Sequence, residues 1–315
     1  MPKLKGIEEK YLFGKPIDKE NDDTFFVDSE HIYLNKQDGS PYISCTQLIH
    51  EYSNPFNVDF FAKYKALEQL ADSDSFSWIK QGLLGTQVWK PDLLEKLKID
   101  EGEFNKVVEE IKTTWEKNRI ESAENGTKLH ELLENSFYGK SSFDLSKYGC
   151  PQVCGNYSCI KGNYRLDLEN GIYPELLISY VSPEGLHIAG TADLVVKSGN
   201  NIDILDWKSS KEIKKKSYFN SIKKKNLMMK YPLTNIMDSN YYHYSLQLSL
   251  YAYMLQQKNP EFNIRSLTIV QIPKDGDPKE YPANYLKDEV ERVIKHYAKQ
   301  QKIKCELERD KPFIM

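Results

Sequence analysis

The chain has 315 residues, of which 40% are hydrophobic and 12% aromatic, and its formal net charge is −3. This content allows one large domain or a core with one accessory region, and the charge excludes a polycation that binds nucleic acid over its whole surface. No apolar run reaches the length of a transmembrane helix, and the first residues lack the apolar centre of a signal peptide, which predicts a cytoplasmic protein without membrane contact.

The first 100 residues are expected to form an accessory region of a small hairpin and helices. Two short apolar runs, His31–Asn35 and Tyr42–Cys45, flank a turn-forming stretch and predict the hairpin. Ser44-Cys-Thr-Gln47 has the pattern of a capping box and predicts the start of a short helix. A second helix is expected over residues 58–71. The core would then occupy residues 101–315.

The clearest helical pattern follows residue 100. Its apolar side chains recur at three- and four-residue spacing, which predicts one buried helix face: Phe104, Val107, Val108, Ile111 and Trp115. The pattern fades after Trp115, and we expect the helix to end by Asn125-Gly126, a pair typical of helix ends. A separate helix, Lys128–Phe137, would carry His130.

Three of the five cysteines, Cys150, Cys154 and Cys159, cluster before the next strand. An odd total without a signal peptide favours reduced thiols. Three thiolates could begin a zinc or iron–sulfur site, but the cluster contains no CxxC pair. A structural metal here remains an open alternative.

A β-hairpin with acidic side chains is expected in the centre of the chain. Leu186–Lys197 and Ile202–Ser209 are rich in β-branched residues, and Gly199-Asn200 between them suits a two-residue loop. That loop sets Asp193 directly opposite Asp206. Lys208 follows two residues later on the same face, because strand side chains alternate.

A third carboxylate is expected beside this pair. Ile172–Tyr180 reads as a strand, joined to the next one by Pro183-Glu-Gly185, which suits a three-residue loop. In that register Glu175 also lies opposite Asp193.

The acid pair predicts a metal site. Carboxylates directly opposite each other repel, unless a divalent cation such as Mg²⁺ lies between them. An ordinary surface hairpin is the alternative. Two features argue against that alternative: Ala192, Leu194 and Val196 make the opposite face apolar, and Val195 and Ile204 flank the acids on their own face. A strand that is apolar on both faces is expected to be buried on both faces. A buried acid pair needs a partner.

The most basic segment comes next: residues 211–230 contain eight lysines and one glutamate. Such a run is usually a solvated loop, but directly after a metal strand it is well placed to hold a phosphate backbone. The lysines expected to do so form two triplets: Lys214, Lys215, Lys216, Lys223, Lys224 and Lys225.

The remaining elements complete an α/β pattern. Tyr241–Gln256 is a strong helix, on which Gln247 and Tyr251 share one face. A strand follows at Arg265–Ile272 and a long amphipathic helix from Asn284 to about Glu308. We therefore expect a central mixed β-sheet flanked by helices, with a mainly helical N-terminal region.

Five motifs now stand in order: Gly126-x-x-x-His130, Glu175, Gly190-Thr-Ala-Asp193, Asp206-Trp-Lys208 and Gln247-x-x-x-Tyr251. In this order, over roughly residues 100–275, they resemble the PD-(D/E)xK nuclease superfamily. Within it they are similar to the RecB-like exonuclease branch, including phage-encoded members that act in the host cell and mitochondrial genome-maintenance exonucleases. The resemblance implies a restriction-endonuclease-like core.

The resemblance also implies roles for the residues. Asp193, Asp206 and His130 would bind Mg²⁺ or Mn²⁺. Lys208 would position the water or steady the transition state, and Glu175 would be a carboxylate of the metal or its water shell. These side chains would form the catalytic centre.

The implied activity is a metal-dependent DNA exonuclease. It would act on single-stranded DNA or DNA ends in recombination, repair or replication, and Gln247 and Tyr251 would contact the DNA or brace the site. Two alternatives stay open: a structure-specific endonuclease on the same fold, and a non-catalytic DNA-binding or virion protein.

Overall fold

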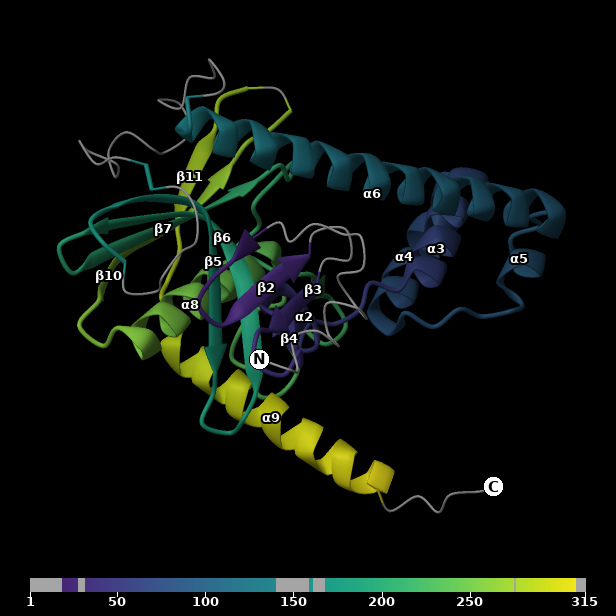
Figure 1. Cartoon of the computed structure of the whole chain (residues 1–315). Coiled ribbons are helices and arrows are strands. Elements are labelled where there is room, and N and C mark those ends of the chain that lie inside the picture. Colours follow the sequence, from purple (N-terminus) through teal and green to yellow (C-terminus); the bar gives the residue numbers. More distant parts are fainter. Residues whose placement is uncertain (1–18, 28–31, 140–158, 161–167, 275, 310–315) are drawn as a thin grey trace.

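The computed structural model describes residues 19–27, 32–139, 159–160, 168–274 and 276–309. It confirms a mixed β-sheet flanked by helices (Figure 1). None of the helices in these ranges combines the length and the hydropathy that crossing a membrane requires.

The sheet is built around β6 (His187–Ser198). One edge of β6 pairs along its length with antiparallel β5 (Gly171–Val181). The other edge is shared, because β4 (Pro41–Ser44) pairs in parallel with the start of β6 and β7 (Asn201–Lys208) pairs antiparallel with its end. The sheet therefore forks along this edge, between Ala189 and Leu194.

Further strands extend both arms of the fork. Beyond β7 lie parallel β10 (Asn263–Gln271) and antiparallel β11 (Lys279–Pro282). Beyond β4 lie β3 (Ile32–Asn35), β2 (Thr24–Val27) and β1 (Lys19–Glu20), all antiparallel. The expected hairpin of the N-terminal region is confirmed, and its strand β4 also joins the central sheet. The domain boundary at residue 100 stays a prediction.

Both expected registers around β6 are confirmed. The loop at Gly199-Asn200 sets Leu194 opposite Leu205, and the loop at Pro183–Gly185 sets Pro174 opposite Leu194 and Leu176 opposite Ala192.

The alternation of side chains was predicted incorrectly at one point. Leu194 and Val196 pack on the α6 side of the sheet, whereas Ala192 packs on the opposite side with Val195. The shift occurs at Asp193 and at Glu175 across from it, where Glu175 has a φ of 51°. Non-glycine residues rarely adopt this left-handed conformation, and such residues cluster at functional sites.

One face of the sheet is covered by three helices. α8 (Asn240–Lys258) lies against it with α2 (Cys45–His50), α9 (Lys287–Arg309) packs on α8, and the three helices share the largest apolar cluster with the sheet. The predicted capping box is confirmed, because Ser44 Oγ accepts from Gln47 N and Gln47 Oε1 accepts from Ser44 N. The pairing of β4 with β6 and the capping box at Ser44 together hold α2 at the fork.

The other face is covered by the C-terminal part of α6 (Glu101–Phe137). There Leu133 is fully buried among side chains of β5, β6, β7 and β10. The N-terminal part of α6 packs in a second core with α3 (Val58–Leu70), α4 (Ser73–Thr86) and α5 (Leu93–Lys96). Figure 1 shows α6 running from the α3, α4 and α5 helices to the sheet.

The prediction of two helices in this stretch was wrong, because α6 is continuous through Asn125-Gly126. A helical glycine costs only about 1 kcal/mol relative to alanine. Burial of apolar side chains at both ends of α6, among them Phe104, Val108 and Leu133, outweighs that cost.

Candidate active site

The fork of the sheet gathers the predicted acidic residues. Where β7 diverges from β6, Trp207 N donates to Asp193 Oδ2 at 2.6 Å, so a carboxylate oxygen replaces the usual backbone acceptor. This bond fixes the Asp193 carboxylate, which is only 5% exposed, between the two strands.

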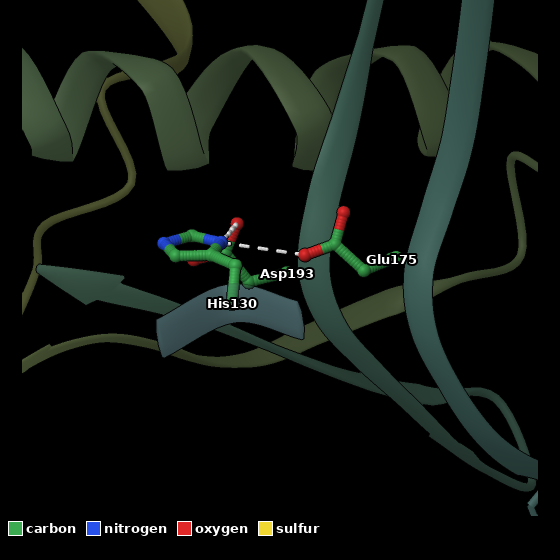
Figure 2. Close-up of side chains that lie close together, drawn as sticks. All are labelled: His130, Glu175 and Asp193. Carbon is green, nitrogen blue, oxygen red and sulfur yellow. Dashed lines mark hydrogen bonds and ion pairs between the residues drawn. The ribbon is translucent and has the colours of Figure 1, made fainter. Parts of the chain in front are cut away.

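Three potential ligands converge beside the fork. His130 comes from α6, Glu175 from β5 and Asp193 from β6, and one ligand atom from each lies within 4.8 Å of the others. His130 Nδ1 lies 3.3 Å from Glu175 Oε1 and 3.5 Å from Asp193 Oδ1. Figure 2 shows the imidazole turned toward both carboxylates.

The orientation of His130 is set by a backbone group. Its Nε2 lies 3.2 Å from the carbonyl oxygen of Trp207, which can only accept, so Nε2 carries the proton. In the neutral ring the lone pair then resides on Nδ1, the atom that faces the carboxylates. This arrangement, in which the second nitrogen donates to a carbonyl, is typical of histidines that bind metals.

The carboxylates of this cluster change the acidity of their neighbours. Asp193 raises the pKa of His130 to about 9, against the effect of burial and with support from Glu175. Burial raises the pKa of Asp193 above its ordinary value, and His130 opposes that shift. A buried acid of this kind requires a positive charge nearby.

Asp206 and Lys208 form an adjacent pair. Lys208 Nζ donates to Asp206 Oδ1 at 2.8 Å, and it also lies 5.0 Å from the ring centre of Tyr244 on α8. Burial alone would lower the pKa of Lys208, but Asp206 and Asp193 raise it above its ordinary value. The ammonium group is therefore charged and held in place.

The two carboxylate oxygens of Asp206 have different surroundings. Asp206 Oδ2 is buried and makes no hydrogen bond with any described residue. A buried carboxylate oxygen without a donor carries a large desolvation cost that a cation would offset. Asp206 lies outside the group of His130, Glu175 and Asp193, whose ligand atoms come within 4.8 Å of one another and whose oxygen atoms suit a hard divalent ion.

These groups border a cavity of about 490 Å³. Every predicted catalytic or metal-binding residue except Asp206 lines it, as do Gln247 and Tyr251. The six predicted DNA-binding lysines do not line it, and all six are exposed around the hairpin of β8 (Phe219–Asn220) and β9 (Lys225–Asn226).

Tyr251 lies beneath the site rather than in its open part. Its side chain is 3% exposed, and its hydroxyl accepts from Gln247 Nε2 at 2.9 Å. A Cβ on Gly190 would lie 2.7 Å from Tyr251 Cε1 and 3.0 Å from Cys45 Sγ. The glycine of the Gly-Thr-Ala-Asp motif is therefore needed for close contact with the tyrosine of the Gln-x-x-x-Tyr motif.

Several lining residues escaped the sequence analysis. They come from the N-terminal strands, from the start of α2 and from α6: Phe26, Tyr33, Ser44, Cys45, Thr46, Glu131 and Glu134. The capping box located α2, but only the parallel pairing of β4 with β6 brings it to the fork. The position of Glu134, four residues after His130, was the one usable signal, because it shares that helix face.

The cysteine cluster lies largely outside the described residues. Cys150 and Cys154 belong to the part not described. Cys159 is a half-buried free thiol, and burial raises its pKa to about 11.

One family model matches part of the chain. The model of the PD-(D/E)XK nuclease superfamily matches residues 163–311, which include Glu175, Asp193, Asp206 and Lys208. This match supports a metal-dependent nuclease. No curated protein matches the chain.

One similar solved structure is described as "Crystal structure of SSO0001". It is 14% identical to this chain, and the alignment covers 93% of this chain and 81% of that one with a TM-score of 0.34. A TM-score this low does not establish a common fold.

Proposed function

We propose that this protein is a Mg²⁺- or Mn²⁺-dependent deoxyribonuclease that degrades single-stranded DNA or DNA from its ends. The observation that carries the proposal is the convergence of His130, Glu175 and Asp193 beside the Asp206–Lys208 pair in one cavity. The family match over residues 163–311, which include Glu175, Asp193, Asp206 and Lys208, supports it.

The residues of the site would have separate roles in metal binding and catalysis. His130, Asp193, Asp206 and Glu175 would hold the cation, directly or through its water shell. A divalent cation bound there supplies a charge that activates water and stabilises a phosphodiester under attack. Lys208, kept charged by Asp206, would orient the attacking water and offset the negative charge that develops on the phosphate.

DNA would be held by groups around the cavity. The six exposed lysines of the β8–β9 segment offer positive charge for the phosphate backbone. Gln247 and Tyr251 would brace the cavity wall, with Gln247 near enough to the cavity to contact DNA. We infer a role in recombination, repair or replication, where such ends arise.

The test is cleavage of end-labelled single- and double-stranded DNA with Mg²⁺, Mn²⁺ or EDTA. We expect metal-dependent cleavage, and a loss of at least about 10²-fold in Lys208→Ala and in the isosteric Asp206→Asn. Lys258→Ala is the matched control, since Lys258 pairs with Asp23 at the surface, 2.7 Å away and apart from the cavity.

The outcomes separate the alternatives. Full activity in a folded Lys208→Ala protein would contradict the mechanism. Internal cuts without release of terminal nucleotides would favour the endonuclease. DNA binding without cleavage in any metal would favour the non-catalytic DNA-binding protein.

A further inference from the structure

A second cavity lies between the end of α4 and the β8–β9 hairpin. Its volume is about 360 Å³, and no described residue lines both this space and the catalytic cavity. Residues 85–87, at the end of α4, form one wall. The other wall includes residues of the hairpin and its flanks: Tyr218, Asn220, Lys223, Lys225, Asn226 and Leu227. We call this space the hairpin cavity, and its size is that of a small-ligand site.

The two walls of the hairpin cavity are fixed to each other. Tyr218 Oη donates to Leu84 O at 3.1 Å, and Asn220 Nδ2 donates to Gly85 O at 3.0 Å. The side chain of Ile222 packs on Gly85 so closely that a Cβ on this glycine would overlap it. The hairpin is therefore docked on α4 by hydrogen bonds and by apolar contact, and the cavity between them is preformed.

Positive charge borders the hairpin cavity. Lys223 and Lys225 line it and are exposed, whereas no described acidic residue lines it. Asn220 Oδ1 accepts from Ile222 N at 3.1 Å and from Lys223 N at 2.9 Å, and these bonds hold the turn that carries the lysines. The two ammonium groups are therefore placed to attract phosphates beside an occupant of the cavity.

Exposed aromatic side chains flank this charge. Trp78 is 86% exposed and precedes Gly85 by seven residues on α4, so it lies on the helix face that carries the hairpin, about 10 Å from Gly85 along the axis. Gly82 lies on the same face between them, and a Cβ there would meet no atom within 4 Å. Phe219 of β8 is 55% exposed. Aromatic rings beside lysines are typical of surfaces that bind single-stranded nucleic acids, because bases stack on the rings while the lysines hold the phosphates.

The lining of the hairpin cavity suits an unpaired base. Besides the lysines, it combines the uncharged polar side chains of Thr86, Gln87 and Asn226 with the apolar groups of Tyr218 and Leu227. An unpaired base offers the matching combination, with hydrogen-bonding groups on its edges and a face that stacks. In a duplex the edges are paired and the faces are stacked, so a base enters a cavity only after it has left the helix. The hairpin cavity therefore favours a single strand over a duplex.

We propose that the hairpin cavity binds an unpaired base of single-stranded DNA, with neighbouring phosphates on Lys223 and Lys225 and a further base stacked on Trp78. This strand-holding site lies apart from the catalytic cavity, so it retains its affinity in EDTA. The inference takes DNA as the ligand from the proposed function, on which it rests in this respect. It deepens that function by adding base contacts that a phosphate-binding surface alone does not provide.

Two variants test the site through binding in EDTA, measured by fluorescence anisotropy with a labelled thymidine oligonucleotide. Thr86→Trp fills the hairpin cavity from its α4 wall, and Trp78→Ala removes an exposed ring that belongs to none of the described apolar clusters. We expect each variant to weaken binding by about fivefold or more, which is the effect of losing one stacked base.

Two further variants serve as controls. Thr113→Trp makes the same change as Thr86→Trp at an exposed position of α6, and it should bind the oligonucleotide as the unmodified protein does. Trp78→Phe keeps an aromatic ring and should restore most of the affinity that Trp78→Ala loses.

An abasic oligonucleotide of the same length separates base contacts from phosphate contacts. It carries the same charges without bases, so the unmodified protein should bind it more weakly than the thymidine strand. Thr86→Trp and Trp78→Ala should not weaken the binding of this probe further. If both variants lost the same factor on both probes, the effect would not involve bases and the inference would be overturned.

The two proposals fail separately. Equal affinity of Thr86→Trp, Trp78→Ala and Thr113→Trp for the thymidine strand would overturn the base-binding site, even where metal-dependent cleavage persists. Base-dependent binding that both variants reduce, in a protein that cleaves no DNA with Mg²⁺ or Mn²⁺, would overturn the nuclease proposal and leave the base-binding site in place.

Discussion

Gly190 shows how one missing side chain holds two motifs together. Tyr251 occupies the space where a Cβ would stand, 2.7 Å from that position, and Cys45 Sγ lies at 3.0 Å. We predict that Gly190→Ala destabilises the protein by about 1–3 kcal/mol, because a buried ring and a thiol must both shift. Denaturant unfolding measures this change in the free energy of unfolding.

Gly82 provides the matched control for Gly190→Ala. It lies within α4, and a Cβ there meets no atom within 4 Å. Gly82→Ala should not destabilise the protein. A Gly190→Ala protein that is as stable as the unmodified one would show that Tyr251 does not depend on this glycine.

The acidic residues could be located from the sequence because loop length determines register. Two short loops with clear turn residues set Glu175, Asp193 and Asp206 on adjacent strands. The local irregularity at Glu175 could not be predicted, since glutamate has no preference for its φ of 51°. The contact of His130 with the Trp207 carbonyl also depends on tertiary packing that leaves no local pattern.

At the scale of elements, α6 shows where local signals fail. Asn125-Gly126 has the composition of a helix end, yet the helix continues because both of its ends are buried in separate cores. The stripe that fades after Trp115 was the informative sign. It marked the start of an exposed stretch of the helix, residues 116–125, rather than the approach of a helix end.

Gly126 is consequently a weak point in a continuous helix. A Cβ there would meet only Ser209 Oγ at 3.7 Å, an ordinary contact. We predict that Gly126→Ala stabilises the protein by about 0.5–1 kcal/mol, because alanine loses less backbone entropy in a helix. Denaturant unfolding measures the free energy of unfolding of the Gly126→Ala protein, and the Gly82→Ala protein is measured for comparison.

A loss of stability in Gly126→Ala would contradict the helical account. If stability rises while nuclease activity falls, the glycine of the Gly-x-x-x-His motif serves the cavity it lines rather than the helix. The two measurements together separate a structural role from a functional one.

At the scale of the whole molecule, the long-range pairings were the least predictable feature. β4 and β6 are separated by more than a hundred residues, and only two residue pairs join them. That short parallel contact brings α2 to the fork. Hydrophobic patterns identify strands, but they do not specify which distant strands become neighbours.

The charge distribution leads to a prediction for the complete protein. The net charge is −3, so attraction to DNA depends on the local excess of lysine in residues 211–230. We consider the triple variant Lys214→Ala/Lys215→Ala/Lys216→Ala. The slope of log binding constant against log salt concentration should become shallower by about 2 for single-stranded DNA, because each lost phosphate contact reduces the slope by about 0.7. Binding measured at several salt concentrations in EDTA isolates this effect from cleavage.

A triple variant on α9 supplies the control. Lys295, Lys299 and Lys302 are also exposed, and their replacement by alanine changes the net charge by the same amount. If overall charge alone governed binding, both triple variants would show the same salt dependence. A shallower slope only for the triplet beside the β8–β9 hairpin would assign the phosphate contacts to this basic segment.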